Sequence, residues 1–132
     1  LVEVGPRDLE AGQVTIVRRD TLEKSTLPIE GIGEAIVRLL DDVHQGLYNK
    51  ALQMRDSKIF EVENLAQLRD AVEKNHGFAS AMWCGSRECE DRIKEETGAT
   101  SRVMPFEQHL MGDTCVCCGK KAKINMLFAR SY

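Results

Sequence analysis

The cysteines of this chain constrain its fold more than any other feature, because all five lie in two short clusters. The first cluster is Cys84-Gly-Ser-Arg-Glu-Cys89, and the second is Cys115-Val-Cys117-Cys118-Gly-Lys. About as many residues separate the clusters as separate the two ligand pairs of many structural zinc sites. The glycine after Cys118 lets backbone amides turn toward the second sulfur of its pair. The sequence therefore predicts a tetrahedral zinc site formed by two cysteine pairs.

Four thiolates would close the coordination sphere and leave no position for an activated water, so we expect the zinc to be structural. The predicted ligands are Cys84, Cys89, Cys115 and Cys118. Cys117 is then a spare thiol, although three clustered cysteines leave open which two of them bind the metal. His109 could replace a cysteine, but its spacing does not recommend it.

Two other uses of the cysteines compete with zinc. A disulfide framework needs an oxidising compartment, whereas the cysteine count is odd and no signal peptide is recognisable. A redox pair at Cys115 and Cys118 would normally open a helix after a strand, but an apolar strand is expected to follow. We favour zinc over both alternatives.

Composition limits the remaining classes of function. The chain has 132 residues, enough for one ordinary domain or two small ones, and a formal net charge of −3. A nearly balanced charge excludes a generally basic nucleic-acid coat, so any such contact must be local. No apolar run reaches the length of a membrane span, and we expect a reducing, cytoplasmic location. The chain starts at Leu1 without a methionine, which indicates a piece of a longer protein.

The first part of the chain reads as strands followed by a long helix. Strands are expected over residues 1–4 and 13–18, with a loop over 7–12 between them. Basic charge gathers at Arg18, Arg19 and Lys24 after the second strand, with Lys24 in a polar turn; a solvated strand end is the simplest explanation. Apolar residues at helical spacing then predict a helix over about 31–56. They are Ile36, Leu39, Leu40, Val43, Leu47, Ala51 and Met54.

The rest of the chain reads as a small α+β unit, with the boundary between residues 56 and 57. Strands are expected over residues 59–62, 78–83, 101–104 and 123–129. One helix starts after Glu63 or Asn64 and ends at Gly77, and a second runs from Ser86 to Gly98 with Cys89 in its first turn. Strands and helices are therefore expected on both sides of the boundary.

Several motifs, taken in order, resemble the C-terminal part of prolyl-tRNA synthetase of the archaeal and eukaryotic-like type. They are Gly5-Pro6-Arg7-Asp8-Leu9, Val17-Arg18-Arg19-Asp20-Thr21 with Lys24, Trp83-Cys84-Gly85, Thr100-Ser101-Arg102, Pro105-Phe106, Cys118-Gly119-Lys120 and Phe128-Ala129-Arg130-Ser131-Tyr132. The resemblance covers essentially the whole chain. It implies the fold class α/β for residues 1–56, as the later part of an anticodon-binding domain with a mixed sheet and a long helix. It implies a small α+β zinc-binding domain for residues 57–132.

The resemblance also implies functional residues and partners. A lysine at the position of Lys24 contacts anticodon bases in the family, and we expect Arg7 and Arg19 to contribute to tRNA binding. Cysteines at the four predicted ligand positions bind zinc, and the C-terminal Tyr132 docks toward the catalytic domain. The full family member is a homodimer that charges proline tRNA, using ATP and Mg²⁺ bound by that catalytic domain.

The sequence departs from the family pattern in three respects. The class II catalytic domain and the first part of the anticodon-binding domain are not among these residues. Leu1 occupies the position of an arginine that contacts the anticodon in the family. Cys117 is an addition without a family role. The alternative is a free-standing, zinc-stabilised module that binds RNA or protein and has no enzymatic activity.

Overall fold

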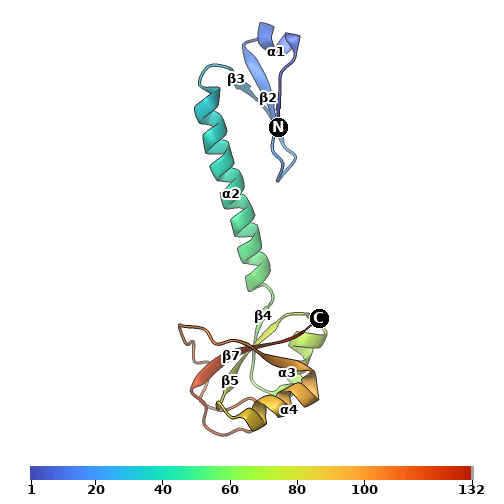
Figure 1. Cartoon of the computed structure of the whole chain (residues 1–132), viewed down its shortest axis with the longest axis vertical. Helices are drawn as coiled ribbons and strands as arrows, with labels where there is room; N and C mark the ends of the chain where they lie inside the picture. The colour runs from blue at the N-terminus through green and yellow to red at the C-terminus, as the bar shows by residue number, and fades with distance from the viewer. Residues whose placement is uncertain (132) are drawn as a thin grey trace. The chain divides into compact units, whose positions relative to one another are not determined.

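The structure is a computed structural model that describes residues 1–131 (Figure 1). The chain forms two compact units: unit 1 comprises residues 1–53, and unit 2 begins at Met54. The sequence placed the boundary three residues later. Two sheets and one long helix confirm the predicted α/β class.

Unit 1 is a three-stranded sheet followed by a long helix. Its elements are β1 (Val2–Glu3), α1 (Pro6–Glu10), β2 (Gln13–Val17), β3 (Lys24–Pro28) and α2 (Ile32–Asp56), whose last turn lies beyond residue 53. The strand order is β1-β2-β3, and both pairings are antiparallel. β2 is central and places Val14 and Ile16 on its buried face, in the alternation expected of a strand.

Two expectations for unit 1 were wrong. Residues 7–12 are not all loop, because Pro6–Glu10 form the short helix α1. Pro6 suits a first helical turn, and the Asp8 carboxylate accepts a hydrogen bond from the Gly5 backbone N–H at 2.9 Å. Lys24 does not lie in the turn. It is the first residue of β3 and pairs with Val17, because β3 continues the antiparallel hairpin begun by β2.

Helix α2 was predicted almost to the residue, but its apolar stripe is mostly exposed. Val43 is its buried residue, whereas Leu40 is 61% exposed and Met54 is 67% exposed. The periodicity of the sequence therefore identified the helix correctly without indicating how much of its face is covered within this chain.

Unit 2 is a mixed sheet with two helices. Its elements are β4 (Ile59–Val62), α3 (Leu65–Glu73), β5 (Phe78–Trp83), α4 (Arg87–Thr97), β6 (Ala99–Val103) and β7 (Ile124–Arg130). The strand order is β4-β5-β7-β6; β4 and β5 run parallel, and β7 is antiparallel to both of its neighbours. The strands at 101–104 and 123–129 were thus predicted with small errors at their ends.

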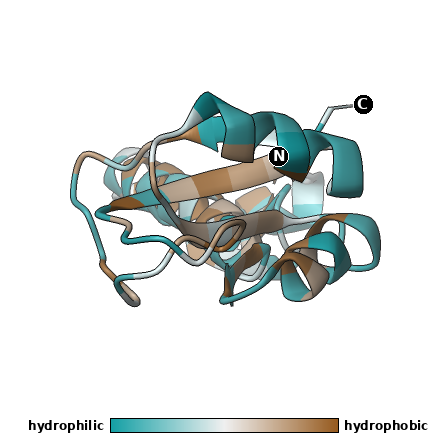
Figure 2. Ribbon diagram, turned by 90° about the horizontal axis from the view of Figure 1, so that it is seen from below, coloured by the Kyte–Doolittle hydropathy of each residue, from teal (hydrophilic) through white to brown (hydrophobic). Residues whose placement is uncertain are grey.

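The core of unit 2 forms where the sheet meets its helices. Apolar strand residues lie between helices with more hydrophilic surfaces (Figure 2). Phe128, Leu68 and Ile93 are fully buried, and Phe128 also packs edge-to-face against Trp83 with ring centroids 6.4 Å apart. The remaining buried members of this cluster are Val62, Ala71, Val72, Ala79, Ala81, Ala99, Val116 and Met126.

The helix ends of unit 2 follow the sequence except at one glycine. Asn64 caps α3 by accepting a hydrogen bond from Gln67, and Gly98 ends α4 with a φ of 70°. Gly77 does not end α3, which stops at Glu73. Gly77 instead permits close packing, since a Cβ there would lie 2.5 Å from the Lys58 carbonyl oxygen.

Among residues 1–131, no helix combines the length and the apolar character needed to cross a membrane.

Candidate metal centre

The first cysteine pair lies where β5 passes into α4. Cys84 directly follows the last residue of β5, and Gly85 turns the chain with a φ of 83°. Cys89 is buried in the first turn of α4, where free backbone N–H groups and the helix dipole favour a negative sulfur. The two Sγ atoms lie 3.6 Å apart, close enough for both to bind one ion.

The second pair lies in a turn held by backbone hydrogen bonds. The Cys115 N–H donates to the Lys120 carbonyl at 2.7 Å, and the Gly119 N–H donates to the Cys115 carbonyl at 2.9 Å. Gly119 has a φ of 68°, the conformation for which a glycine was expected here. This turn folds the Cys115 and Cys118 side chains toward each other.

A single backbone contact attaches this turn to the sheet. The Val116 N–H donates to the Met82 carbonyl in β5 at 2.9 Å, so the second pair is held beside the residue that precedes Trp83 and Cys84. Sequence analysis did not find this contact, because it joins residues 34 positions apart and no side-chain pattern marks it.

The four predicted ligands come together in space. The Sγ atoms of Cys84, Cys89, Cys115 and Cys118 all lie within 4.8 Å of one another, and those of Cys84 and Cys118 are 3.9 Å apart. A tetrahedron with Zn–S bonds of about 2.3 Å has sulfur–sulfur edges of about 3.8 Å, so the spacing fits. Within the described part of the chain, this is the one group of three or more His, Cys, Asp or Glu side chains that could bind a metal ion.

The two other candidate ligands lie outside this group. Cys117 is half-buried, packs against the core of unit 2 and lies beside Cys89. His109 is exposed, and its Nε2 is 3.9 Å from a Glu61 carboxylate oxygen. Neither residue belongs to the set of four.

The local environment acts on the cysteine thiols in opposite directions. Burial raises the pKa of Cys84, of Cys89 and of Cys117. Burial also acts to raise the pKa of Cys115, but hydrogen bonds from the backbone N–H groups of Cys118 and Cys117 outweigh it and lower this pKa to about 7. Four thiolates at these distances repel one another, so a bound cation would stabilise the arrangement.

The predicted tRNA contacts all lie in unit 1 but do not form one cluster. Arg19 and Lys24 are exposed at the end of the sheet where β2 turns into β3. Lys24 Nζ lies 3.9 Å from a Glu3 carboxylate oxygen, a distance that leaves it largely free. Arg7 is exposed in α1, which precedes the start of β2, so it lies at the other end of this sheet.

Arg18 differs from Arg19 and Lys24, because its charge is paired with that of a neighbouring carboxylate. Its guanidinium donates to both Asp20 carboxylate oxygens, at 3.1 Å and 2.8 Å. The hydrogen bond from Arg18 holds the pKa of Asp20 below its usual value. Arg18 therefore stabilises the turn between β2 and β3 that presents Arg19 and Lys24.

Comparison with known families identifies both parts of the chain. The model described as "Prolyl-tRNA synthetase, C-terminal" matches residues 65–132, which is more than half of the chain. The chain belongs to this family. The model of an anticodon binding domain matches residues 1–39, within unit 1.

Relatives of the family match nearly the whole chain. A proline--tRNA ligase of Clostridium botulinum is 46% identical over 131 residues, and proline--tRNA ligase 2 of Clostridioides difficile is 47% identical over the same length. Each alignment covers 99% of this chain and 27% of the relative, so the chain spans about a quarter of the length of these enzymes.

A solved structure agrees with these matches. The crystal structure of prolyl-tRNA synthetase from Cryptosporidium parvum, complexed with L-proline and AMP, aligns with a TM-score of 0.90 and 35% identity. The alignment covers 99% of this chain and 28% of that enzyme.

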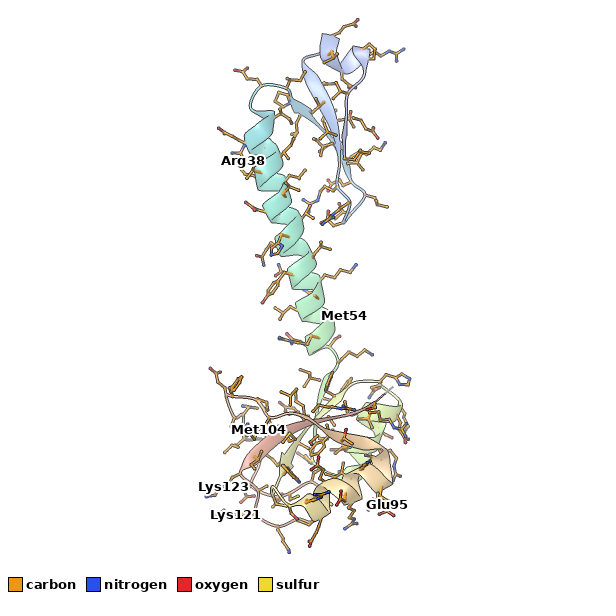
Figure 3. All side chains as sticks on the ribbon, in the orientation of Figure 1. Arg38, Met54, Glu95, Met104, Lys121 and Lys123 are labelled. Carbon is orange, nitrogen blue, oxygen red and sulfur yellow. The ribbon has the colours of Figure 1, made fainter. Side chains whose placement is uncertain are left out.

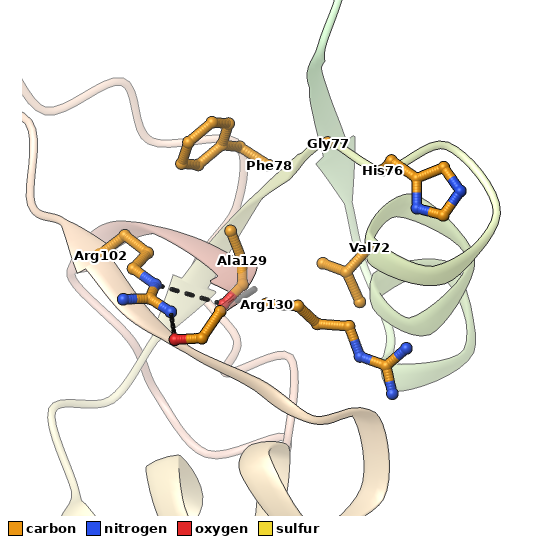
Figure 4. Close-up of a pocket in the computed structure, with 8 residues that line it drawn as sticks. Val72, His76, Gly77, Phe78, Arg102, Ala129 and Arg130 are labelled. Carbon is orange, nitrogen blue, oxygen red and sulfur yellow. Dashed lines mark hydrogen bonds between the residues drawn. The ribbon is translucent and has the colours of Figure 1, made fainter.

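A cavity of about 560 Å³ lies near the end of β7, and both arginines that line it make contacts within the fold (Figure 4). Arg102, which lines it, donates to the Ala129 carbonyl and the Ser131 hydroxyl, and Arg130 pairs with Glu73 at 3.2 Å. The predicted docking residue Tyr132 lies outside the described residues.

Proposed function

We propose that this chain is the part of a proline--tRNA ligase that binds the anticodon loop of proline tRNA and carries a structural zinc domain. One observation carries the proposal: the anticodon-binding match and the synthetase C-terminal match occupy successive parts of a chain that is 46% identical to a proline--tRNA ligase over 131 residues. That similarity favours the ligase over a free-standing module.

The charging reaction would take place elsewhere in the full enzyme. Proline activation with ATP and Mg²⁺ belongs to the class II catalytic domain, in the three quarters of the relatives' length that these residues do not cover. This chain would contribute tRNA binding to a cytoplasmic homodimer. No residue described here is assigned a catalytic role.

The cysteine cluster supports zinc as the metal. Thiolate ligands select soft or borderline ions, and four of them at tetrahedral spacing are typical of zinc. Zinc bound by Cys84, Cys89, Cys115 and Cys118 would hold the turn of the second pair against the end of β5. Its role would be to stabilise the fold, because the four sulfurs leave no position for a substrate.

Anticodon recognition would rest on the basic end of the unit 1 sheet. RNA loops are commonly read when unstacked bases meet side chains on a sheet surface. Lys24 is 66% exposed at the start of β3, and Arg19 is exposed in the adjoining turn, so both could reach a base edge or a phosphate. Arg7 would make a separate contact from α1.

The test uses the full-length ligase and separates tRNA recognition from chemistry. We expect Lys24→Ala to weaken charging of proline tRNA and to leave tRNA-independent proline activation nearly unchanged, because the side chain is exposed and its loss leaves no cavity. Lys50→Ala removes another exposed lysine and is the matched control. Equal losses of charging and activation by Lys24→Ala would mean that this residue acts through stability.

Docking of the C-terminus is tested in the same assays. We propose that Tyr132 anchors the chain end toward the catalytic domain through its ring, hydroxyl and carboxylate. Deletion of Ser131 and Tyr132 should then lower proline activation. If activation survives and only thermal stability falls, the docking proposal is wrong.

A further inference from the structure

The lysines of unit 2 are distributed unevenly between internal contacts and solvent. Most of the lysine and arginine side chains described in this unit contact another group of the same unit. Lys74 pairs with Asp70, Arg92 with Glu96 and Arg130 with Glu73. Arg69 donates to the Glu96 carbonyl, Lys58 to the Asn75 carbonyl, and Arg102 to Ser131.

Most of the lysine side chains that make no such internal contact lie close together in the sequence. Among the described lysine and arginine side chains of unit 2, four have no hydrogen bond or ion pair. They are Lys94, Lys120, Lys121 and Lys123. Three of these four lie in a stretch of four residues that begins two residues after Cys118, the last cysteine of the metal centre. All three are exposed.

The backbone beneath these three lysines is fixed. We define the ligand hairpin as residues 113–124. The Lys120 carbonyl accepts from Cys115, Lys121 forms a β-bridge with Thr114, and the Ala122 N–H donates to the Asp113 carbonyl at 2.7 Å. Ala122 is 4% exposed, so its neighbours Lys121 and Lys123 project to the opposite, solvent side. Figure 3 shows Lys121 and Lys123 at the same edge of unit 2.

The ligand hairpin contains one acidic residue, Asp113. Asp113 is the last acidic residue of the sequence before Tyr132, and it takes part in none of the ion pairs described. The ligand hairpin therefore carries three lysines against one acidic side chain, Asp113, although the chain as a whole has a formal net charge of −3. Such a local surface attracts polyanions without making the protein generally basic.

We propose that Lys120, Lys121 and Lys123 form a second RNA-binding surface, which contacts the phosphate backbone of tRNA independently of its sequence. The inference rests on the proposed tRNA-binding function and adds a site in unit 2. Lysine binds phosphate as a point charge, whereas an unpaired base stacks on an aromatic ring or on the guanidinium plane of an arginine. The ligand hairpin contains neither arginine nor an aromatic side chain on which a base could stack.

The surface and the proposed anticodon contact would therefore differ in what they recognise. Phosphate contacts position an RNA and strengthen binding to any sequence, whereas base contacts discriminate between sequences. Lys24 should affect the preference for proline tRNA. The hairpin lysines should affect affinity for proline tRNA and for an unrelated tRNA by the same factor.

The experiment measures binding of the zinc-loaded full-length ligase to proline tRNA and to alanine tRNA by fluorescence anisotropy, from about 0.05 to 1 M salt. Three contacts predict that K120Q/K121Q/K123Q lowers the slope of log K against log salt by about 2 to 3. This change in slope corresponds to a roughly 100-fold loss of affinity for both RNAs near 0.1 M salt. The loss should disappear near 1 M salt.

Two further variants separate position from charge. K50Q/K58Q/K94Q removes the same charge from exposed lysines elsewhere and should change the salt slope much less. K120R/K121R/K123R keeps the charge and should bind like the original chain. Zinc content and circular dichroism must match in all three variants, so that a loss of binding cannot come from a damaged metal centre.

Each outcome supports or overturns the inference. It is overturned if the hairpin variant binds like the original chain, if the control variant loses as much affinity, or if the loss is confined to proline tRNA. A hairpin variant that keeps tRNA affinity but loses binding to an acidic peptide or to anionic vesicles also overturns it. If the hairpin prediction fails while Lys24 still affects discrimination between the two tRNAs, the proposed function stands. If the full-length ligase binds neither tRNA, both proposals are refuted.

Discussion

Units 1 and 2 bury their apolar residues to very different extents. Unit 2 has a continuous core around Phe128 and a second buried cluster around the cysteines. Unit 1 buries Val14, Ile16 and Val43, while much of the apolar face of α2 stays exposed. The stability of unit 2 can therefore come from its own core and a metal. Unit 1 relies within this chain on an antiparallel hairpin, a few packed side chains and local helix formation.

The metal should produce the largest difference between the two units. We expect Cys115→Ser to abolish metal binding and unfold unit 2, because structural zinc supplies on the order of 10 kcal/mol of folding free energy in small domains. Hydrogen exchange should show loss of protection in β5 and β7, with β2 and β3 unchanged. Metal analysis should find about one zinc in the original chain and none in the variant.

Cys117→Ser is the matched control for that experiment. It also removes a thiol from the same turn, but Cys117 lies outside the group of four. We expect it to keep the zinc and most of the stability. If Cys117→Ser loses the metal while Cys115→Ser keeps it, the ligand set is wrong.

The core of unit 2 should produce the next largest effect. Phe128→Ala removes a side chain that is 0% exposed and should lower the free energy of unfolding of unit 2 by about 3–5 kcal/mol. The single tryptophan, Trp83, packs against Phe128, so urea unfolding can be followed by its fluorescence. Phe106→Ala, at a fully exposed phenylalanine, should change stability by less than about 0.5 kcal/mol.

A smaller effect is expected in unit 1. Val43 is the buried residue of α2, at 6% exposure, and Val43→Ala removes about two buried methyl groups. The expected cost is about 1.5 kcal/mol, measured as faster hydrogen exchange in β2 and the first turns of α2. Unchanged exchange in unit 1 would show that its elements are held together by something other than the burial of Val43.

The smallest effect tests whether the exposed stripe of α2 is truly uncovered. Leu40 is 61% exposed, so Leu40→Gln should change the stability of this chain by no more than about 0.5 kcal/mol. Thermal unfolding of Leu40→Gln and Val43→Ala side by side provides the measurement. A loss from Leu40→Gln as large as that from Val43→Ala would mean that the stripe is buried in solution, and the contrast between the units would fail.

Sequence patterns predicted the features that depend on local spacing. Helical periodicity located α2, a polar cap located the start of α3, and paired cysteines located the candidate metal centre. Strand β3 was missed because Lys24-Ser-Thr-Leu-Pro28 has little strand character of its own and forms by pairing with β2. The role of Gly77 was also missed, because the approach of the Lys58 carbonyl depends on the packing of β4 beside β5.

The candidate RNA contacts illustrate the same limit. Arg18, Arg19 and Lys24 looked alike in sequence, yet the pairing of Arg18 with Asp20 sets it apart. No acidic residue lies between the three hairpin lysines and Arg130 in sequence, yet the ion pair of Arg130 with Glu73 distinguishes it from those lysines. Which cations remain free is decided by acidic partners that a one-dimensional pattern cannot place.

The strand order of unit 2 also has a consequence for its synthesis on the ribosome. β7 is the last strand of its sheet to be translated, but it lies between β5 and β6 and pairs with both. Residues 99–103 therefore have no sheet partner until residues 124–130 have left the exit tunnel, and Cys84 and Cys89 must wait for the second cysteine pair. During that interval the nascent chain exposes an unpaired strand and two thiols without a bound metal. A translational pause in this stretch should increase its capture by chaperones.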